Sequence, residues 1–341
     1  MLLNFTIGFV MIKPVIEMTK EHVLKMLMME EDYLSGETVS RELGITRAAV
    51  SIAVKSLREE GYIIDSVTNR GYKLLVRPDI LSEGAVAAFL PEGRMDNVCF
   101  LKKVDSTNDY LRQLAQQGAP QGQVVISDYQ TKGKGRQGRS FDSPPGAGVY
   151  FSYLFRPNTI PSDTAEITAW SAVAVQNAIR SVCGFEADIK WINDLVVGER
   201  KLCGILTELS VEAESGQIQF VIIGVGINCN ESTEDFAPDI QDRATSMFLQ
   251  TGSRIDRSRL AAKLVGHFDR MVQDWPDEHD RYLEQYRQWC STTGRMITVF
   301  RGNETETAYA EHVDDHFGLV VRMNDGSIKV LNSGEVSTRN K

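Results

Sequence analysis

A basic, glycine-rich stretch at residues 133–140, GKGRQGRS, is the part of the sequence whose residue types point most directly to chemistry. The stretch matches the G-x-G-x-x-G pattern of dinucleotide-binding loops, and it also matches a P-loop with arginine in place of the lysine. Both kinds of loop must open a helix whose N-terminus faces a phosphate. The residues after Arg139, SFDSPPGAG, contain two prolines and two glycines that oppose a helix. The stretch therefore belongs to neither class.

Four cations lie in or beside this loop: Lys132, Lys134, Arg136 and Arg139. Glycines let backbone N–H groups approach an anion closely, and the cations add positive charge in an otherwise acidic part of the chain. We interpret the stretch as an anion-binding loop. The alternative, on composition alone, is a solvated basic hairpin.

The chain of 341 residues is 42% hydrophobic and 24% charged, which is the composition of an ordinary globular protein with two or three domains. Its net charge of -9 is unevenly distributed, because residues 40–77 carry seven Lys and Arg against four Asp and Glu. A basic segment in an acidic protein indicates a local anionic partner.

Five cysteines without a C-x-x-C pair favour a reducing compartment over a disulfide framework or a zinc site.

The apolar opening, residues 1–12, is too short to span a bilayer and lacks the basic start of a signal peptide. We interpret it as a poorly defined extension, with Met11 a plausible initiator. We expect a cytoplasmic protein with no membrane partner.

Three helices and a hairpin are predicted before residue 78. In order they are a helix at 20–29, a short helix at 37–43 that ends at Gly44, a helix at 46–60 with Thr46 as N-cap and Gly61 as C-terminal cap, and two strands at 62–76 around the turn Asn69-Arg70-Gly71. This order is the plan of a winged helix-turn-helix.

The third helix buries one apolar face, Val50, Val54 and Leu57, so its opposite face can enter a DNA major groove. The residues predicted to contact DNA are Thr46, Arg47, Ser51, Lys55 and Arg58 on this helix, and Arg70 and Lys73 on the wing. The alternative is a solvated basic helix in a domain that does not bind DNA. Because the basic segment coincides with the helix and wing, we favour DNA.

The remainder of the chain alternates strands and helices and ends in short strands. We expect a helical connector at 80–93, then strand, turn and helix at 98–118 with Ser106 or Thr107 at the helix N-terminus. Strands at 122–130 and 148–155 precede a helix at 165–182 capped by Asp163 and Glu166, and strands follow at 188–197, 201–210 and 218–228. Residues 231–257 are predicted to be an acidic irregular loop, 258–289 to be helical, and the chain from 291 to form short strands. Short turns at 198–199 and 214–216 predict antiparallel neighbours, and the last strands predict a small β-barrel.

Six blocks of this sequence resemble biotin protein ligases. They are VDSTNDYL (104–111), YQTKGKGRQGRSF (129–141), KWINDL (190–195), RKLCGILTE (200–208), IGVGIN (223–228) and SGEVS (333–337), in the order and approximate spacing of that family. With the winged helix in front, the chain is similar to the bifunctional type, which is both ligase and biotin-operon repressor.

The resemblance implies an α+β fold in four parts. These are the extension 1–12, the winged helix-turn-helix at 13–78, a catalytic domain at 79–290 with the mixed sheet of class II aminoacyl-tRNA synthetases, and an SH3-like barrel at 291–341. The reaction implied is the activation of biotin by Mg-ATP to biotinyl-5′-AMP, followed by transfer of biotin to a lysine of a biotin carboxyl carrier protein. Operator DNA and a homodimer formed with biotinyl-adenylate are the other implied partners.

The resemblance also implies roles for individual residues. The biotin-binding residues would be Ser106, Thr107, Asn108, Gln130, Gly133, Lys134, Arg136, Lys201, Gly204, Gly224 and Gly226; the ATP-binding residues Lys134, Arg136, Arg139, Phe141, Lys190, Asn193 and Asn228; and the catalytic residues Lys201, Arg136 and Asp194. Asp194 is also the candidate for Mg²⁺ or for accepting the proton of the acceptor lysine. The structural alternatives are a turn cap at Asp194, an exposed turn lysine at Lys201 and a bulge at the two strand glycines.

Three residues depart from the family pattern. Lys134 stands where arginine is common, Phe141 where tryptophan is common and Ile192 where proline is common. Lysine keeps the charge but loses the bidentate geometry of arginine, and phenylalanine keeps an aromatic face without the indole N–H.

The competing interpretations are a lipoate-type ligase, whose R-R-x-S-G-G-G block is missing, and a ligand-sensing regulator without ligase activity.

Overall fold

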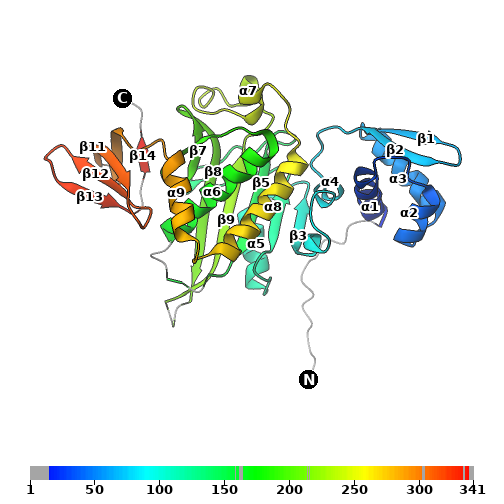
Figure 1. Cartoon of the computed structure of the whole chain (residues 1–341), viewed down its shortest axis with the longest axis horizontal. Coiled ribbons are helices and arrows are strands. Elements are labelled where there is room, and N and C mark those ends of the chain that lie inside the picture. The colour runs from blue at the N-terminus through cyan, green and yellow to red at the C-terminus, as the bar shows by residue number, and fades with distance from the viewer. Residues whose placement is uncertain are drawn as a thin grey trace. The chain divides into compact units, whose positions relative to one another are not determined.

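The computed structural model describes residues 15–157, 159–160, 164–212, 214, 216–301, 304–332 and 335–337 (Figure 1). The predicted extension 1–12, the capping residue Asp163 and part of the SGEVS block lie outside these ranges. The chain divides after Ala88 into two compact units. The first unit thus extends beyond residue 78, where the sequence suggested a boundary.

The first unit contains four helices and one hairpin among its described residues. The elements are α1 (Val15–Met29), α2 (Gly36–Leu43), α3 (Arg47–Glu59), β1 (Ile63–Val67), β2 (Gly71–Val76) and α4 (Glu83–Ala87). Val23, Leu24 and Leu27 of α1 form one core with the buried Val50, Val54 and Leu57 of α3. The predicted helix-turn-helix with a β-hairpin wing is confirmed.

Local signals set the ends of α3. The side chain of Thr46 accepts a hydrogen bond from the backbone N–H of Ala49, as an N-cap does. Gly61 adopts a φ of +99°, and the N–H groups of Gly61 and Tyr62 donate to the carbonyls of Arg58 and Leu57. These two bonds form a Schellman motif, which ends the helix and directs the chain into β1.

Helix α4 belongs to the first unit because α1 caps it. The carboxylate of Glu21 accepts hydrogen bonds from Ser82 Oγ and from the N–H of Gly84, both at 2.7 Å. A Cβ at Gly84 would lie 2.2 Å from the carbonyl oxygen of Glu21, so only glycine permits this approach. The expected connector is therefore a short helix fixed to α1.

The second unit is built on a seven-stranded mixed sheet in the order β3-β4-β5-β9-β8-β7-β6. The strands are β3 (Val98–Leu101), β4 (Val124–Ser127), β5 (Val149–Phe155), β6 (Asp188–Lys190), β7 (Asp194–Val197), β8 (Arg200–Val211) and β9 (Ile218–Ile227). Strands β3 and β4 are parallel and the other pairs are antiparallel, which confirms the orientation predicted for β7 to β9. The prediction of one strand at 188–197 is wrong, because the chain turns at 191–193 and β6 pairs with β7.

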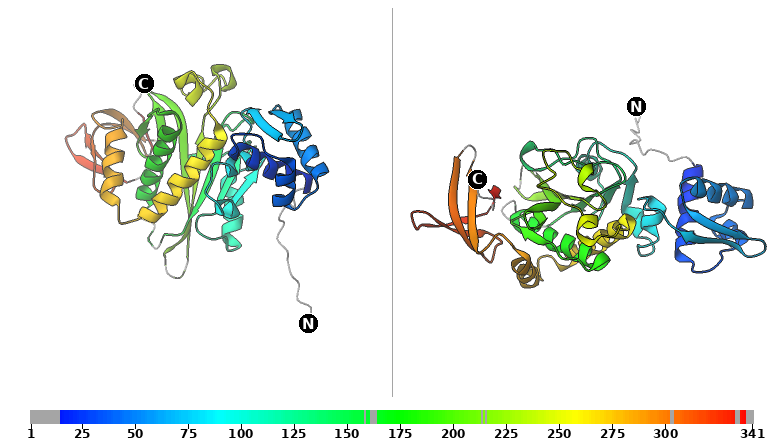
Figure 2. Two further views of the ribbon diagram at one scale, coloured as in Figure 1. Left: turned by 45° about the vertical axis from the view of Figure 1, so that its right-hand side comes forward. Right: turned by 90° about the horizontal axis from the view of Figure 1, so that it is seen from above.

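Helices cover both faces of this sheet (Figure 2). On β5 the side chains alternate, so Phe151 and Tyr153 pack against Phe268 of α8 while Leu154 packs with Leu111 of α5 on the other face. The helices are α5 (Thr107–Gln116) on one face, and α6 (Thr164–Cys183) and α8 (Arg257–Asp274) on the other. Helix α9 (His279–Trp289) packs on α6 and β6.

Of the two predictions about residues 231–289, the first needs correction. The expected irregular loop contains the 3₁₀ turn Thr233–Asp235 and the helix α7 (Met247–Thr251), which Ser246 caps. Residues 258–289 are largely helical, as predicted, and form two helices, α8 and α9, that are separated at Trp275-Pro276, where proline cannot continue the backbone hydrogen bonds.

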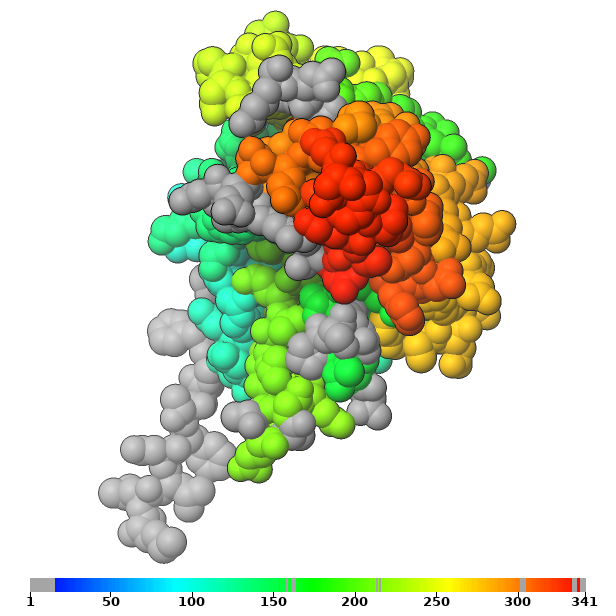
Figure 3. Space-filling view, turned by 90° about the vertical axis from the view of Figure 1, so that its left-hand side faces the viewer, coloured from blue at the N-terminus to red at the C-terminus, as the bar shows by residue number. Residues whose placement is uncertain are grey.

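The C-terminal residues form a five-stranded antiparallel sheet in the order β13-β12-β11-β10-β14. Its strands are β10 (Arg295–Arg301), β11 (Glu304–Val313), β12 (Leu319–Met323), β13 (Ile328–Leu331) and β14 (Glu335–Ser337). The surface of this sheet, red and orange in Figure 3, adjoins that of α9. The indole N–H of Trp191 donates to the carbonyl of Phe317, and Arg287 donates to that of Val313, so the sheet is tied to the larger one.

Within the described residues, no helix combines the length and apolar character needed to cross a membrane.

The wing turn provides a test of the first unit. Gly71 has a φ of +111°, and a Cβ there would lie 2.1 Å from the carbonyl oxygen of Leu34, whereas Gly44, at +65°, has nothing within 4 Å. We expect Gly71→Ala to destabilise the unit by at least about 3 kcal/mol and Gly44→Ala by only about 1 kcal/mol, because the second substitution adds left-handed strain alone. Hydrogen exchange of the α3 amides in the full chain measures both. Equal losses would contradict the close approach.

Candidate functional site

The glycine-rich loop begins against the segment that precedes α5. The N–H of Thr131 donates to the carbonyl of Val104 at 2.9 Å, and that of Lys132 donates to the carbonyl of Asp105 at 2.8 Å. Beyond this anchor the loop contains one 3₁₀ turn, Arg136–Gly138, and no α-helix. The prediction that the loop opens no helix is confirmed.

A cavity lies between this loop, the N-terminus of α5 and the strands β8 and β9. It is lined by Ser106, Thr107, Asn108, Gln130, Lys134, Gly135, Arg136, Phe141, Asn193, Lys201, Gly204, Ile205, Leu206, Gly224, Val225 and Gly226. Every residue predicted to bind biotin lines this cavity except Gly133. That glycine lies behind it, where a Cβ would be 2.3 Å from the carbonyl oxygen of Phe141.

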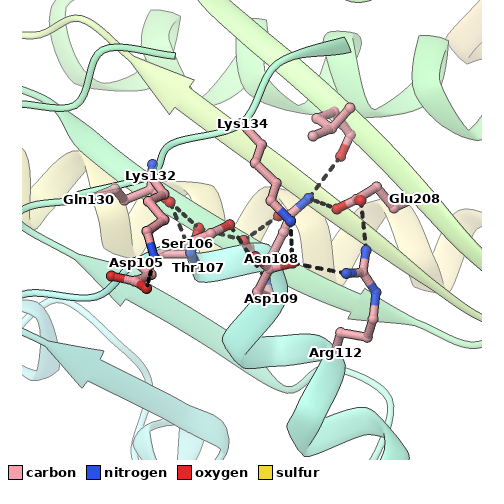
Figure 4. Close-up of polar contacts among 12 residues, drawn as sticks. Asp105, Ser106, Thr107, Asn108, Asp109, Arg112, Gln130, Lys132, Lys134 and Glu208 are labelled. Atoms are coloured by element: carbon pink, nitrogen blue, oxygen red, sulfur yellow. Dashed lines mark hydrogen bonds and ion pairs between the residues drawn. The ribbon is translucent and has the colours of Figure 1, made fainter. Parts of the chain in front are cut away.

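Hydrogen bonds fix the polar end of the cavity (Figure 4). Ser106 is the N-cap of α5, which decides between the two predicted cap residues. The N–H and the hydroxyl of Thr107 both donate to Gln130 Oε1, at 2.9 and 3.0 Å. Gln130 Nε2 in turn donates to Ser143 Oγ at 3.0 Å. The orientation of the Gln130 amide is thereby set before any ligand arrives.

Asn108 is held between three strands. Its Nδ2 donates to Glu208 Oε2 on β8 at 2.7 Å, and its Oδ1 accepts from Ser152 Oγ on β5 at 2.6 Å. Gly224 of β9 is paired with both Leu206 and Ser152, and a Cβ there would lie 2.2 Å from Asn108 Oδ1. Glycine is therefore required here for the packing of Asn108.

Positive charge gathers at the other end of the cavity. Lys201 Nζ lies 2.7 Å from Asp194 Oδ1, and Arg136 Nη1 donates to Asn193 Oδ1 at 2.9 Å. The N–H of Lys201 donates to the carbonyl of Arg243, and its own carbonyl accepts from the N–H of Thr245, so the 243–245 segment holds the start of β8. Fixed cations of this kind can stabilise a developing anion.

Two further cavities adjoin the first. One is lined by the aromatic rings of Phe141 and Phe236, by Ile240 and Ala244, and by Asn228, whose Nδ2 donates to the carbonyl of Thr245. The other is lined by five cations, Arg139, Lys190, Lys201, Arg243 and Arg295, with the carboxylates Asp194 and Glu199. All predicted ATP-binding residues therefore border one of the three connected regions.

The residues at 236–244 were missed in the sequence. Those that line a cavity, Phe236, Ile240, Arg243 and Ala244, are apolar or basic side chains in an acidic segment without helical or strand periodicity, so no pattern marked them. Asp109 and Glu208 were also missed as site residues, although both lie inside blocks that carry the family resemblance. The signal that could have found Asp109 is its negative charge, which is opposite to that of the loop lysines.

Asp194 is the only predicted metal ligand. Among the residues that the structure describes, no group of three or more His, Cys, Asp or Glu could hold a metal ion. The carboxylate of Asp194 contacts Lys201 and also accepts from Asn193 Nδ2 at 3.2 Å. The metal role of Asp194 stays a prediction.

The predicted DNA-binding residues of α3 divide into two groups. Arg47, Ser51 and Lys55 are exposed on the outer face of the helix. Thr46 uses its hydroxyl as the N-cap, and Arg58 donates to the carbonyl of Ile64 and to Ser66 Oγ, which ties the helix to the wing.

The wing cations are also engaged within the first unit. Arg70 Nη2 lies 3.1 Å from Asp32 Oδ1, and its guanidinium lies 4.1 Å above the ring of Tyr33. Lys73 contacts the same carboxylate at 3.9 Å. Both side chains remain partly exposed, but a phosphate would have to compete with Asp32 for them.

Comparison with known proteins agrees with this arrangement. Residues 100–228 match the model of the "Biotin/lipoate A/B protein ligase family", and residues 19–73 match that of an "HTH domain". The fold is similar to that of the biotin protein ligase from Aquifex aeolicus in complex with biotin and ATP, with a TM-score of 0.61 and 27% identity, covering 72% of this chain and 99% of that one. A helix-turn-helix unit joined to such a sheet and cavity is the architecture of a ligase that carries a DNA-binding module.

Two relatives share nearly the whole chain. The bifunctional ligase/repressor BirA of Bacillus subtilis (strain 168) is 33% identical over 307 residues, which cover 89% of this chain and 93% of the relative. The protein of the same description from Escherichia coli (strain K12) is 27% identical over 314 residues, which cover 92% and 95%. The chain belongs to the family of bifunctional biotin ligase/repressors.

Glu231 also lines the cavity that contains Phe141 and Phe236, and it allows a test of that wall. Its side chain is 1% exposed, its Oε2 has no hydrogen-bond partner, and burial raises the pKa of the carboxyl from 4.5 to about 7. The unfolded chain loses this proton at lower pH than the folded chain, so the stability present below pH 4.5 falls as the pH rises toward 7.

We expect Glu231→Gln, which cannot ionise, to gain about 2 to 3 kcal/mol in free energy of unfolding relative to the parent between about pH 5 and pH 8. Urea unfolding of both proteins across this range measures the difference. The exposed Glu234, on the same segment, is the matched control, and its glutamine variant should track the parent. A difference that does not change with pH would contradict burial of the carboxyl.

Proposed function

We propose that the chain activates biotin with Mg-ATP and transfers it to a lysine of a biotin carboxyl carrier protein, and that its first unit represses transcription in response to biotin. In the first step a carboxylate oxygen of biotin attacks the α-phosphorus, and pyrophosphate leaves. In the second step the ε-amine of the acceptor lysine attacks the acyl carbon, and AMP leaves. The observation that carries the proposal is the first cavity, which brings together residues predicted to bind biotin or ATP from five segments of the chain, 106–108, 130–141, 193, 201–206 and 224–226.

The two ends of the cavity suit the two ends of biotin. Hydroxyl and amide groups of Ser106, Thr107 and Gln130 match the polar ureido ring. Lys201 and Arg136 lie at the other end, where the carboxylate would meet the α-phosphate. The first step brings anions together, so these cations would stabilise the negative charge of its transition state.

The neighbouring cavities suit the rest of ATP. The ring of Phe141 offers a face for adenine stacking and Asn228 offers a polar group beside it, while Arg139 and Lys190 line the cationic region for the remaining phosphates. Magnesium is commonly bound by one or two carboxylates together with substrate phosphates, and Asp194 is the carboxylate at this point. With Lys201 beside it, Asp194 is also the candidate acceptor of the lysine proton.

The finer architecture follows from the same proposal. The seven-stranded sheet would be of the class II synthetase type, and the five-stranded C-terminal sheet would be an SH3-like barrel forming a separate domain. Biotinyl-adenylate would promote a homodimer whose two winged helices reach a palindromic operator. A lipoate-type ligase is the alternative, because the matching family model includes lipoate ligases.

The ligase reaction is tested by incubating the protein with Mg-ATP, biotin and a biotin carboxyl carrier domain, and scoring the acceptor by intact mass. We expect one biotin per acceptor and no transfer of lipoate. Lys201→Ala should slow adenylation about 10²- to 10³-fold, because a fixed charge at the reacting phosphate is lost. Lys263→Ala, on the exposed side of α8, is the control. Transfer of lipoate in preference to biotin would favour the alternative, and an active Lys201→Ala would remove this role from Lys201.

DNA binding is tested through its salt dependence. We expect Arg47→Ala and Lys55→Ala each to weaken binding to a non-specific duplex and to reduce the slope of log K against log salt by about 1, because each removes a phosphate contact. Arg58→Ala should leave the slope unchanged, since its guanidinium is bonded to β1 and the wing. Titrations from about 50 to 200 mM salt measure all three. A slope that none of them changes would place DNA on another surface.

A further inference from the structure

The exposed face of α3 carries two apolar side chains. Ile52 is 57% exposed, although an apolar side chain adds stability only when it is buried and isoleucine is a poorer helix former than alanine. Ala48, one helical turn earlier, is exposed as well. Residues four apart lie one above the other on a helix, so the two side chains form a short apolar strip. The core of the first unit contains neither of them.

The apolar strip points away from that core. Successive residues of a helix are about 100° apart around its axis, so the buried Val50, Val54 and Leu57 lie on one side of α3 and the strip lies on the opposite side. The strip also belongs to the first two turns of α3. In a helix-turn-helix, residues near the N-terminus of the recognition helix contact the base edges. The strip thus occupies the part of α3 that is placed to read DNA sequence.

Two exposed cations flank the strip along α3. They are Arg47 before it and Lys55 after it, and both suit phosphate groups of the DNA backbone. The other basic side chains predicted to contact DNA are engaged within the first unit. Arg58 is bonded to β1, while Arg70 and Lys73 both contact Asp32. The side chains available to the groove are therefore mainly those of α3 itself.

The exposed residues between these two cations limit which base edges α3 can recognise. They are Ala48, Ser51 and Ile52. None carries the amide or guanidinium group that makes two hydrogen bonds to adenine or guanine, and the hydroxyl of Ser51 can bond to a donor or to an acceptor. The apolar strip matches one group in the major groove, the 5-methyl group of thymine.

We propose that Ile52, with Ala48 beside it, gives this protein a preference for particular DNA sequences by contacting the 5-methyl group of thymine in the major groove. The preferred site then contains at least one thymine whose methyl group lies against α3. Arg47 and Lys55 contribute affinity that does not depend on sequence. The inference rests on the proposed binding of DNA and adds the base that the helix reads.

The test begins by selecting a preferred duplex from a random pool with the full chain, biotin and Mg-ATP. Each thymidine of that duplex is then replaced by deoxyuridine, which lacks only the 5-methyl group, and Kd is measured at one salt concentration for the parent and for Ile52→Ala. We expect at least one replacement to weaken binding of the parent about fourfold, because the burial of one methyl group is lost. The same replacement should leave the Kd of Ile52→Ala unchanged. The variant should fold normally, since Ile52 is exposed and alanine favours the helix.

Ile63→Ala is the matched control, because Ile63 is 54% exposed in the same unit but lies on β1. This variant should respond to each deoxyuridine as the parent does. If no replacement weakens binding of the parent, or if the same replacement weakens the parent and Ile52→Ala by the same factor, the strip does not read thymine and the proposal is wrong, while DNA binding stands. If the selection enriches no sequence, the proposal fails together with the sequence-specific repression on which it rests.

Discussion

The candidate site depends on three glycines of the neighbouring strands β8 and β9, which place no side chain on the surface of the sheet. Gly204 and Gly226 are direct partners in the β8 and β9 pairing, and Gly224 lies on the same face. Added Cβ atoms would lie 2.9 Å from Lys201 Nζ, 2.5 Å from the Phe141 ring and 2.2 Å from Asn108 Oδ1. The side chains of Lys201, Phe141 and Asn108 can rest on the sheet only because these positions carry none.

The polar groups around this bare patch are arranged by a connected set of hydrogen bonds. Side-chain hydrogen bonds connect Gln130 to Thr107, Thr107 to Ser152, Ser152 to Asn108 and Asn108 to Glu208. Their donor–acceptor distances lie between 2.6 and 3.0 Å. Buried polar groups are costly unless each has a partner, so a network of this kind also fixes the orientation of its members. The polar end of the cavity is thereby shaped before substrate binds, while the cationic end is held by Asp194 and Asn193.

The two units use positive charge in different ways. In the second unit, cations from the loop, β8 and the C-terminal sheet meet around connected cavities, and Arg139, Arg243 and Arg295 among them are exposed to solvent. In the first unit, Arg58 and Arg70 are engaged with the protein, and the exposed face of α3 carries Arg47 and Lys55. A count of basic residues therefore overstates the charge available to DNA.

The sequence by itself determined the local structure and the family. Thr46, Gly61 and the wing turn act through hydrogen bonds a few residues long, so their positions predict α3 and the hairpin correctly. The six blocks were sufficient for the family, because they occur in its order and approximate spacing. Tertiary structure alone decided which groups meet. The pairing of Lys134 with Asp109 and the capping of α4 by Glu21 join residues that lie far apart in the sequence, and the turn at 191–193 and the bonding of Arg58 to β1 are contacts that residue type alone did not mark. No local periodicity encodes such contacts, since they depend on which elements pack together and on the space that each leaves.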